Sequence, residues 1–403
     1  MIKMFVIIIF FIGLYNAVEA PEFEVTVTAG DLNRLNTIVS FSFPIYVESG
    51  IYQMENNSGE CVTIQVDDNT GWFLLDSLDA GDSVTYSIDT SRPHADLSGP
   101  EITIQEDYNT ITFKYNGRSI LRYFSGDNIL PDSLDDVYKR GGYIQPAYSP
   151  KGTVVTSHLN TDLLPHHYGI WTSWTNTQFR GRDLSFWDLR QKNGKIVQAD
   201  SVEYQWQGPV HSGIQAQHRY LDLSSNPSVV ALNEKWGIYT YSPVTNDHSY
   251  NRFDLVITQT ANSGNPLIIK KHVYGGLGLR GHSDWDDSSN GTFMTSEGLG
   301  RDGNETRSRW VHIGGHSDGK QAGIAIFGHP ENTRHPQPMR IHPELAFLSY
   351  APNQLGEMAI EPGTPYVAEY RFITYDGEPD LDLLDQLWYD YAYPPGVTVK
   401  VLQ

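Results

Sequence analysis

Residues 61–75, CVTIQVDDNTGWFLL, place two short apolar runs, Cys61 to Val66 and Gly71 to Leu75, on either side of a polar stretch. Short runs rich in β-branched and aromatic residues, separated by Asn, Asp, Gly or Pro, are typical of β-strands joined by turns. The same rhythm recurs over residues 23–28, 38–43, 83–88, 102–104 and 110–115. The sequence therefore predicts an all-β protein, built as a sandwich or as several packed antiparallel sheets.

Helical patterns are scarce in this chain. The strongest runs from Asp380 to Tyr391, where Leu384, Leu387 and Trp388 recur at helical spacing. Residues 132–138 are long enough for a single turn. We expect one helix near the C-terminal end of the sequence and little other helical structure.

Three segments are expected along the chain. Residues 1–20 combine Lys3, an apolar run from Phe5 to Leu14 and a small-residue cleavage motif, which together indicate a signal peptide. A turn signal at Asn116-Gly117 predicts a boundary between a small N-terminal β module, residues 21–117, and a larger domain, residues 118–403. The larger domain holds nearly all the His and Trp residues.

Composition limits the partners and the location of the protein. No stretch after the signal peptide has the ~18 consecutive apolar residues of a membrane helix, so we expect an exported protein, periplasmic or secreted, without a membrane span. The net charge of −20 disfavours binding to nucleic acid or to an anionic membrane. Cys61 is the only cysteine, which excludes an intramolecular disulfide.

Residues 165–175, PHHYGIWTSWT, concentrate the side chains that could carry chemistry. His166 and His167 can exchange protons near neutral pH, and the indoles of Trp171 and Trp174 offer flat faces on which a sugar ring can stack. Aromatic residues often fill cores instead, and a Trp pair three apart fits that reading too. Neighbouring residues of a strand point to opposite faces, so at least one of the two histidines should lie on a loop or face a pocket or solvent.

Three later stretches add ionisable groups. Residues 272–282, HVYGGLGLRGH, would present Tyr274, Arg280 and His282 on one face if extended, unless the glycines break the register. Residues 328–344, GHPENTRHPQPMRIHPE, form a proline-rich loop that carries His335 and Arg340. Residues 301–316 are the weakest of the three, since their arginines fit an exposed salt-bridge ladder equally well.

Metal and nucleophile motifs are missing from the sequence. The chain has 14 His residues but no H-E-x-x-H or C-x-x-C spacing, so we expect no cofactor and no metal-ligating residues, with an assisting divalent ion as the alternative. No G-x-S-x-G motif marks a serine nucleophile.

Several motifs together resemble an exported bacterial family labelled PmoA-like. They are YIQPAYSPKG (residues 143–152), PHHYGIW (165–171), YGG (274–276), GHP (328–330) and HPQP (335–338), and the similarity runs in order from about residue 24 to 375. The resemblance implies a large antiparallel β-supersandwich, as in galactose mutarotase and related polysaccharide lyases. It extends to marine oligosaccharide dehydratases that act on uronic acids of ulvan. The family usually shows a third basic or His residue near the histidine pair, where this chain has Tyr168.

The resemblance implies an elimination on an acidic oligosaccharide. Such a dehydratase removes water from a uronic acid at the non-reducing end and leaves a 4,5-unsaturated sugar, which requires a cation, a base and an acid. We expect Arg280 to hold the carboxylate in a bidentate contact, His167 to take the C5 proton, and Tyr274 or Tyr168 to protonate the leaving oxygen. The residues expected to assist or to contact the sugar are His166, His335, Trp171, Trp174, Arg340 and His282.

Three alternatives remain open at this stage. A polysaccharide lyase would use the same elimination but expel a sugar. A glycoside hydrolase would need two carboxylates about 5 Å or roughly 6.5 to 9.5 Å apart, and Glu203, Glu297, Asp284 and Glu344 are candidates without a recognisable pairing. A non-catalytic carbohydrate-binding protein would keep the aromatic residues and need no titrating base.

Overall fold

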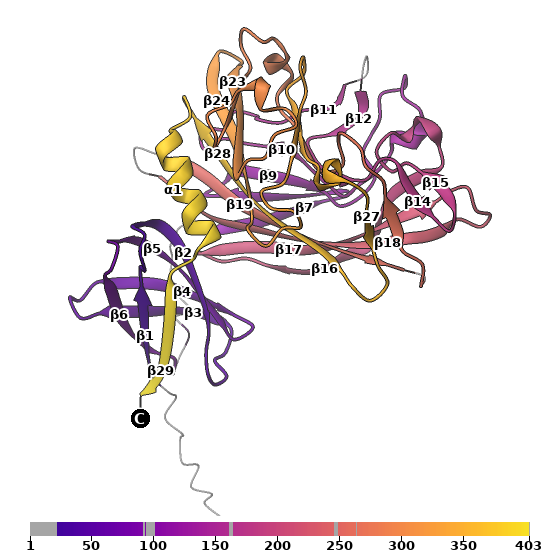
Figure 1. Ribbon diagram of the computed structural model, residues 1–403. Coiled ribbons are helices and arrows are strands. Elements are labelled where there is room, and N and C mark those ends of the chain that lie inside the picture. The colour runs from indigo at the N-terminus through magenta and orange to yellow at the C-terminus, as the bar shows by residue number, and fades with distance from the viewer. Residues whose placement is uncertain are drawn as a thin grey trace, which may run out of the picture.

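The computed structural model describes residues 22–402, except residues 92, 94–100, 161–163, 246–248 and 263 (Figure 1). The expected signal peptide, residues 1–20, lies outside the described residues. Strands dominate the rest of the chain, and the expected all-β class is confirmed. None of the helices in the described part is both long and apolar enough to cross a membrane.

A small sheet, the module sheet, forms the lower left of Figure 1. Its strands, in sheet order, are β2 (Arg34–Ser42), β5 (Thr70–Leu78), β4 (Cys61–Asp67), β3 (Gly50–Asn56), β6 (Ser83–Asp89), β1 (Glu22–Thr28) and β29 (Gly396–Leu402). Alternate residues such as Phe23, Tyr52 and Phe73 are buried in a separate apolar core. The strands predicted over residues 23–28, 38–43, 61–66, 71–75 and 83–88 are confirmed here.

Two large antiparallel sheets form most of the rest of the molecule. The front sheet runs β25 (Met339–Ile341), β26 (Phe347–Tyr350), β21 (Gly276–Arg280), β13 (Ile170–Ser173), β10 (Tyr143–Ala147), β9 (Arg118–Phe124), β8 (Thr110–Tyr115) and β7 (Ile102–Asp107). The back sheet runs β16 (Gly194–Trp206), β17 (His211–Asp222), β18 (Val229–Val244), β19 (Tyr250–Ala261), β28 (Tyr366–Asp376), β24 (Lys320–Gly328), β23 (Trp310–Ser317) and β22 (Thr292–Thr295).

Smaller elements cover the edges and faces of these sheets. A four-stranded sheet contains β15 (Arg182–Leu184), β14 (Thr177–Phe179), β20 (Leu267–Ile269) and β27 (Met358–Ile360), and a two-stranded ribbon joins β11 (His158–Asn160) and β12 (Leu164–Tyr168). Short 3₁₀ turns are η1 (Asp136–Tyr138), η2 (Leu189–Gln191), η3 (Ser283–Asp286), η4 (Arg301–Gly303) and η5 (Pro352–Leu355). The predicted helix is confirmed as α1 (Leu381–Ala392), which packs on the outer face of the back sheet.

The main core lies between the front and back sheets. Ile170 and Leu279 of the front sheet and Ile238 and Leu255 of the back sheet belong to one buried cluster. Because side chains alternate along a strand, the neighbours of these residues face away from the core. The outer face of the front sheet is therefore free to carry polar and aromatic side chains in quantity.

The sheets divide the chain differently from the expected boundary at residue 117. β7 and β8 pair with each other, and β8 pairs with β9, so residues 102–115 belong to the front sheet rather than to the module. The C-terminal strand β29 pairs with β1 along its whole length and completes the module sheet (Figure 1). This return of the chain cannot be read from local sequence, because strand pairing is non-local.

Candidate functional site

The floor of the candidate site is a cross-strand row on the outer face of the front sheet. Trp171 of β13 lies opposite Gly278 of β21, and Ser349 of β26 lies between Gly278 and Arg340 of β25. A side chain at Gly278 would place its Cβ 2.9–3.0 Å from the indole of Trp171. The missing side chain therefore lets this indole lie across β21.

Aromatic rings build the walls above this floor. The Trp171 indole packs against Trp187, 5.1 Å away between centroids, and against Phe347, 6.0 Å away. Trp187 also contacts Tyr274 at 5.3 Å. Trp171, Trp187 and Phe347 are buried, whereas Tyr274 is only half-buried, so the phenol lies nearer to solvent than the other rings.

His166 and His167 lie on β12, in the ribbon that covers this outer face. His167 stacks on Phe347 with 4.6 Å between the ring centroids, and its ring lies 5.2 Å from that of Trp171. The two imidazoles meet edge to face at 5.0 Å. Both side chains are buried, and the Nδ1 atom of each has no hydrogen-bond partner among the described residues.

Two serine hydroxyls are also buried without a hydrogen-bond partner. Ser173 and Ser349 point to the outer face of the front sheet, are buried, and have no partner for Oγ in the described structure. An unpaired buried polar group costs free energy, and native proteins usually satisfy it with a ligand, a water or a neighbour. Two such hydroxyls on the outer face of the front sheet and two such nitrogens on the ribbon that covers it indicate a place where a polar ligand binds.

Burial keeps both imidazoles neutral at neutral pH. It lowers the pKa of His166 to about 4, partly offset by Asp188. Burial also lowers the pKa of His167 well below 6.5, and electrostatic interactions with His166, Arg280 and His342, of which Arg280 is charged at neutral pH, lower it further. An anionic ligand beside His167 would oppose these interactions and raise its pKa, which is the direction a proton acceptor requires.

Arg280 is present at the site, but its guanidinium is already paired. Nη1 and Nη2 bind the two carboxylate oxygens of Asp286 at 2.7 and 2.5 Å, and Nη1 also donates to the carbonyl of Ala346. The expected bidentate contact of Arg280 with a substrate carboxylate is therefore taken by Asp286. His282 caps η3, the turn that carries Asp286, by accepting a hydrogen bond from the amide of Asp284.

The expected register of residues 274–282 does not hold. β21 begins only at Gly276, and the positive φ angles of Gly275 (145°) and Gly276 (80°) turn the chain before it. Tyr274 consequently packs on His272, 4.4 Å between the rings, instead of sharing a strand face with Arg280. Tyr274 and Arg280 still lie on the same outer face, Tyr274 from the loop before β21 and Arg280 from β21 itself.

Tyr168, Trp174 and His335 were expected at the site, but each is held by packing or hydrogen bonds within the protein. Tyr168 is buried, its hydroxyl donates to the carbonyl of Tyr138, and its ring lies under Arg140. Trp174 points into the main core, where its Nε1 donates to Gln259.

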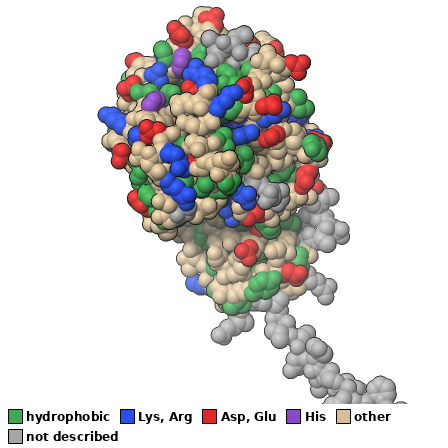
Figure 2. Space-filling model, turned by 90° about the vertical axis from the view of Figure 1, so that its right-hand side faces the viewer, with side chains coloured by type: hydrophobic (Ala, Val, Ile, Leu, Met, Phe, Trp, Pro, Cys, Tyr) green, Lys and Arg blue, Asp and Glu red, His purple; other side chains and the backbone are tan. Residues whose placement is uncertain are grey.

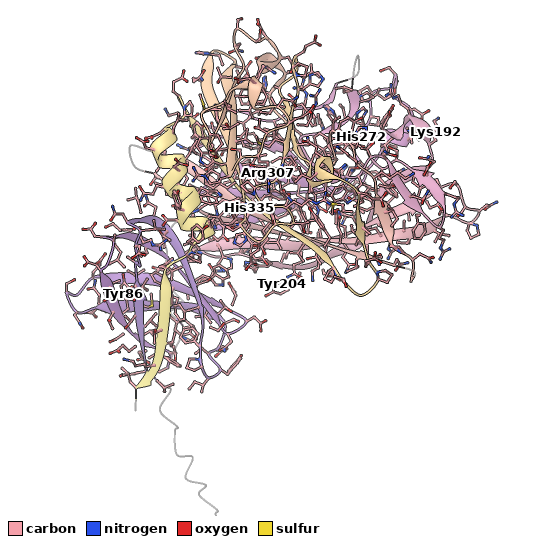
Figure 3. The ribbon with its side chains drawn as sticks, in the orientation of Figure 1. Tyr86, Lys192, Tyr204, His272, Arg307 and His335 are labelled. Carbon is pink, nitrogen blue, oxygen red and sulfur yellow. The ribbon has the colours of Figure 1, made fainter. Side chains whose placement is uncertain are left out.

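His335 stacks 6.1 Å above Trp388 of α1, which covers the back sheet. Figure 3 shows His335 beside Arg307 in the middle of the molecule, well to the left of His272. Trp174 and His335 therefore lie away from His167 and Tyr274, whereas Tyr168 belongs to the same aromatic cluster but has its hydroxyl bonded to Tyr138.

Sequence reasoning did not find Trp187, Phe347, His342 or Ser349. Phe347 and Ser349 alternate with buried Leu348 and Tyr350, but this parity identifies the outer face only once β26 is known to follow β21 in the sheet. Nothing local in the sequence places Trp187 beside Trp171. Among the described residues, no three His, Cys, Asp or Glu side chains are grouped to hold a metal ion.

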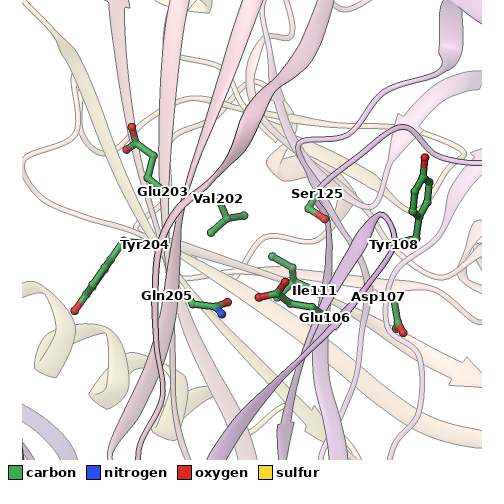
Figure 4. A pocket seen from close by; sticks show the side chains of 9 residues that line it. All are labelled: Glu106, Asp107, Tyr108, Ile111, Ser125, Val202, Glu203, Tyr204 and Gln205. Atoms are coloured by element: carbon green, nitrogen blue, oxygen red, sulfur yellow. The ribbon is translucent and has the colours of Figure 1, made fainter.

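A cavity of about 340 Å³ lies elsewhere, between the β7–β8 hairpin and β16 (Figure 4). Its lining includes three carboxylates, Glu106, Asp107 and Glu203, but no histidine, arginine or lysine. In Figure 4 the side chains of Glu203 and Tyr204 point away from Ile111 and Val202. Figure 2 shows acidic and basic side chains interspersed over the face turned to the viewer, with no large patch of one sign.

Comparison with protein families gives one match, over residues 110–389, to a family of unknown function, DUF6807. The chain belongs to the DUF6807 family. The matched range begins at β8 and ends within α1, so it contains the entire back sheet, the front sheet apart from β7, and all the site residues described above. The DUF6807 unit is thus the sandwich without the module sheet.

Solved structures and curated proteins add little to the family assignment. An alpha-mannosidase from Enterococcus faecalis V583 shares 8% identity with a TM-score of 0.40, covering 95% of this chain and 46% of its own. A protein in glycosyl hydrolase family 38 from Enterococcus faecalis shares 9% identity with a TM-score of 0.35, covering 96% of this chain and 48% of its own. The chain thus spans less than half the length of either structure. No curated protein matches the chain.

Proposed function

We propose that this DUF6807 protein is a carbon–oxygen lyase, a dehydratase that eliminates water from a uronic acid at the non-reducing end of an oligosaccharide. The observation that carries this proposal is the surroundings of His167: a buried, neutral imidazole with an unpartnered Nδ1 lies among aromatic rings and near the guanidinium of Arg280. A neutral imidazole can accept a proton, and aromatic rings bind the C–H faces of sugars.

The positive charge of Arg340 at the rim favours an anionic sugar. Arg340 is half-buried beside Ser349, and one terminal nitrogen binds Asn304 at 3.0 Å while the remaining donors can reach a ligand. His342 is also half-buried, and its Nδ1 accepts backbone hydrogen bonds from Glu344 and Leu345. Because both terminal nitrogens of Arg280 already bind Asp286, we assign the sugar carboxylate to Arg340 and give Arg280 a positioning role.

The proposed step balances as a proton-coupled elimination. His167 takes the C5 proton, the C5–H electron pair forms the C4–C5 double bond, and the C4–O bond breaks. Tyr274 donates a proton to the departing oxygen, so that water leaves and an unsaturated uronate remains. Burial raises the pKa of Tyr274, which keeps this phenol protonated until the step. Trp171 would orient the sugar from below.

Other catalytic classes fit this site in different degrees. A polysaccharide lyase would use the same residues and expel a sugar in place of water. The carboxylates proposed for a hydrolase are scattered: Glu203 binds Gln217, Glu297 lies near Arg309 and Asp284 lies near His282. Kinship with the PmoA-like family, an ulvan-type substrate and an exported location form part of the same proposal.

Incubation with purified uronate-ended oligosaccharides tests the proposal. Ultraviolet absorbance reports the conjugated double bond, and mass spectrometry reports what has left the substrate. Loss of water with gain of absorbance is the expected result. Chain cleavage with absorbance would indicate a polysaccharide lyase, cleavage without absorbance a hydrolase, and binding without turnover a carbohydrate-binding protein.

A further inference from the structure

Arg252 lies in the seam where the module sheet, the back sheet and α1 meet. It is only 2% exposed, although it is an arginine on the outer face of β19. Its Nη1 donates to the carbonyl of Asn36 in the module at 2.7 Å. Its Nε and Nη2 atoms are buried and have no hydrogen-bond partner among the described residues.

The acidic groups of the seam are committed to other arginines. Asp254 holds Arg371 in a bidentate pair, with both distances 2.7 Å. Asp390 of α1 binds Arg34 of the module at 3.0 Å. Of these three guanidinium groups, Arg252 is the one without a bonded carboxylate, although the charges of Asp254 and Glu369 act on the seam from a greater distance.

A buried arginine cannot compensate for the missing carboxylate by losing its proton, since its pKa stays far above neutral pH. The rings of Tyr241 and Tyr250 face its charge, 5.6 and 5.9 Å from Cζ to the ring centroids. Ring faces offset part of the charge but accept no strong hydrogen bond. The hydroxyls of Tyr250 and Tyr391 are buried in the same seam and also have no partner among the described residues.

We propose that this seam binds a small monovalent anion of the halide type, held by Nε and Nη2 of Arg252 and by tyrosine hydroxyls. The anion would neutralise the guanidinium of Arg252 and satisfy the open donors. It would do so only when the module, the back sheet and α1 are assembled, because each contributes a group to the seam. Halide binding would therefore stabilise the docking of the module on the sandwich.

Thermal unfolding of the full chain tests this proposal. We compare sodium chloride and sodium bromide with sodium gluconate at equal ionic strength, because gluconate is too large for a closed seam. The melting temperature should rise by about 2 °C for each tenfold increase in halide above the dissociation constant, and should stay flat in gluconate. Equal melting curves in all three salts would overturn the proposal.

Variants and crystals locate the effect. Arg252→Met should remove the halide response, whereas Arg118→Met, a change at an exposed arginine on β9, should preserve it. Tyr391→Phe removes one hydroxyl with little change of volume, and should shift the response to higher halide concentration even if Arg252→Met fails to fold. Crystals grown in bromide should show an anomalous peak within hydrogen-bond distance of Arg252 Nη2; a water there instead contradicts the assignment.

Discussion

The imidazole of His167 lies nearly parallel to the phenyl ring of Phe347, with 4.6 Å between centroids and 27° between planes. Phe347 in turn pairs across the sheet with Arg280. The stack fixes the imidazole plane and removes water from one of its faces, while the cation beside it disfavours protonation. In the proposed elimination, an imidazole held in this way would accept a proton once an anion has bound nearby.

Replacement of His167 by Gln should therefore abolish turnover while leaving the packing largely intact. Loss of a general base typically costs about 10²–10⁴-fold in rate. Ultraviolet absorbance of the unsaturated product measures the effect. His335→Gln is the matched control, because His335 packs on α1 away from the site and should keep full activity. Near-normal turnover in His167→Gln would remove it from the mechanism.

Substitution of the two tyrosines considered as the acid, Tyr274 and Tyr168, should have different effects on activity. Tyr274→Phe should lower the rate by about 10²-fold or more, since the phenol would supply the leaving-group proton. Tyr168→Phe should keep its activity and lose about 1 kcal/mol of stability, because its hydroxyl only donates to the carbonyl of Tyr138. Kinetics and denaturant unfolding of both variants check this assignment, and the reverse pattern would exchange their roles.

Gly278→Ala should disturb the floor of the site without touching any ionisable group. Its new Cβ would lie 2.9–3.0 Å from the Trp171 indole, so that ring must shift. We expect a loss of about 1–3 kcal/mol in stability, weaker substrate binding and a change in tryptophan fluorescence. Gly396→Ala is the control, because a Cβ there meets no atom within 4 Å. Unchanged fluorescence and affinity in Gly278→Ala would mean that the Trp171 indole accommodates the added methyl group without shifting.

Stability should fall on acidification below neutral pH. Burial lowers the pKa of His166 to about 4 and that of His312 to about 3, whereas an unfolded histidine titrates near 6.5. The unfolded chain thus binds more protons below pH 6.5, so this stability is fully present above pH 6.5 and is lost as the pH falls through 4. His166 alone should contribute about 3 kcal/mol. Melting temperatures from pH 8 to 4 measure the slope, which should be smaller in His166→Asn.

The stability of the seam should depend on the buried ion pair between Arg34 and Asp390. Asp390→Ala leaves Arg34 buried without its partner, and we expect a loss of about 3–5 kcal/mol. The exposed pair between Lys400 and Glu24 is the contrast, since Lys400→Ala should cost less than about 1 kcal/mol. Denaturant unfolding compares the two variants. Similar losses in both would show that the seam does not rely on this ion pair.

Local sequence was sufficient to predict the early strands and the helix. The alternation of apolar and polar residues predicted the early strands, and the spacing of Leu384, Leu387 and Trp388 predicted α1, because both patterns depend only on the period of the local backbone. The same reasoning found His166, His167, Trp171 and Tyr274, whose residue types are chemically distinctive. It could not exclude Trp174, which lies just beyond β13 and points into the main core, whereas Trp171 points to the outer face.

The amino-acid sequence by itself determined an all-β chain with its ionisable and aromatic groups gathered in a few segments. Only the tertiary structure decided that Phe347 and Trp187 join His167, that Asp286 occupies Arg280, and that His335 belongs to the α1 side. It also decided that β29 returns to pair with β1. The reason is physical: periodicity follows from neighbouring residues, whereas the partner of a strand face or of a charge depends on which distant segments pack against it.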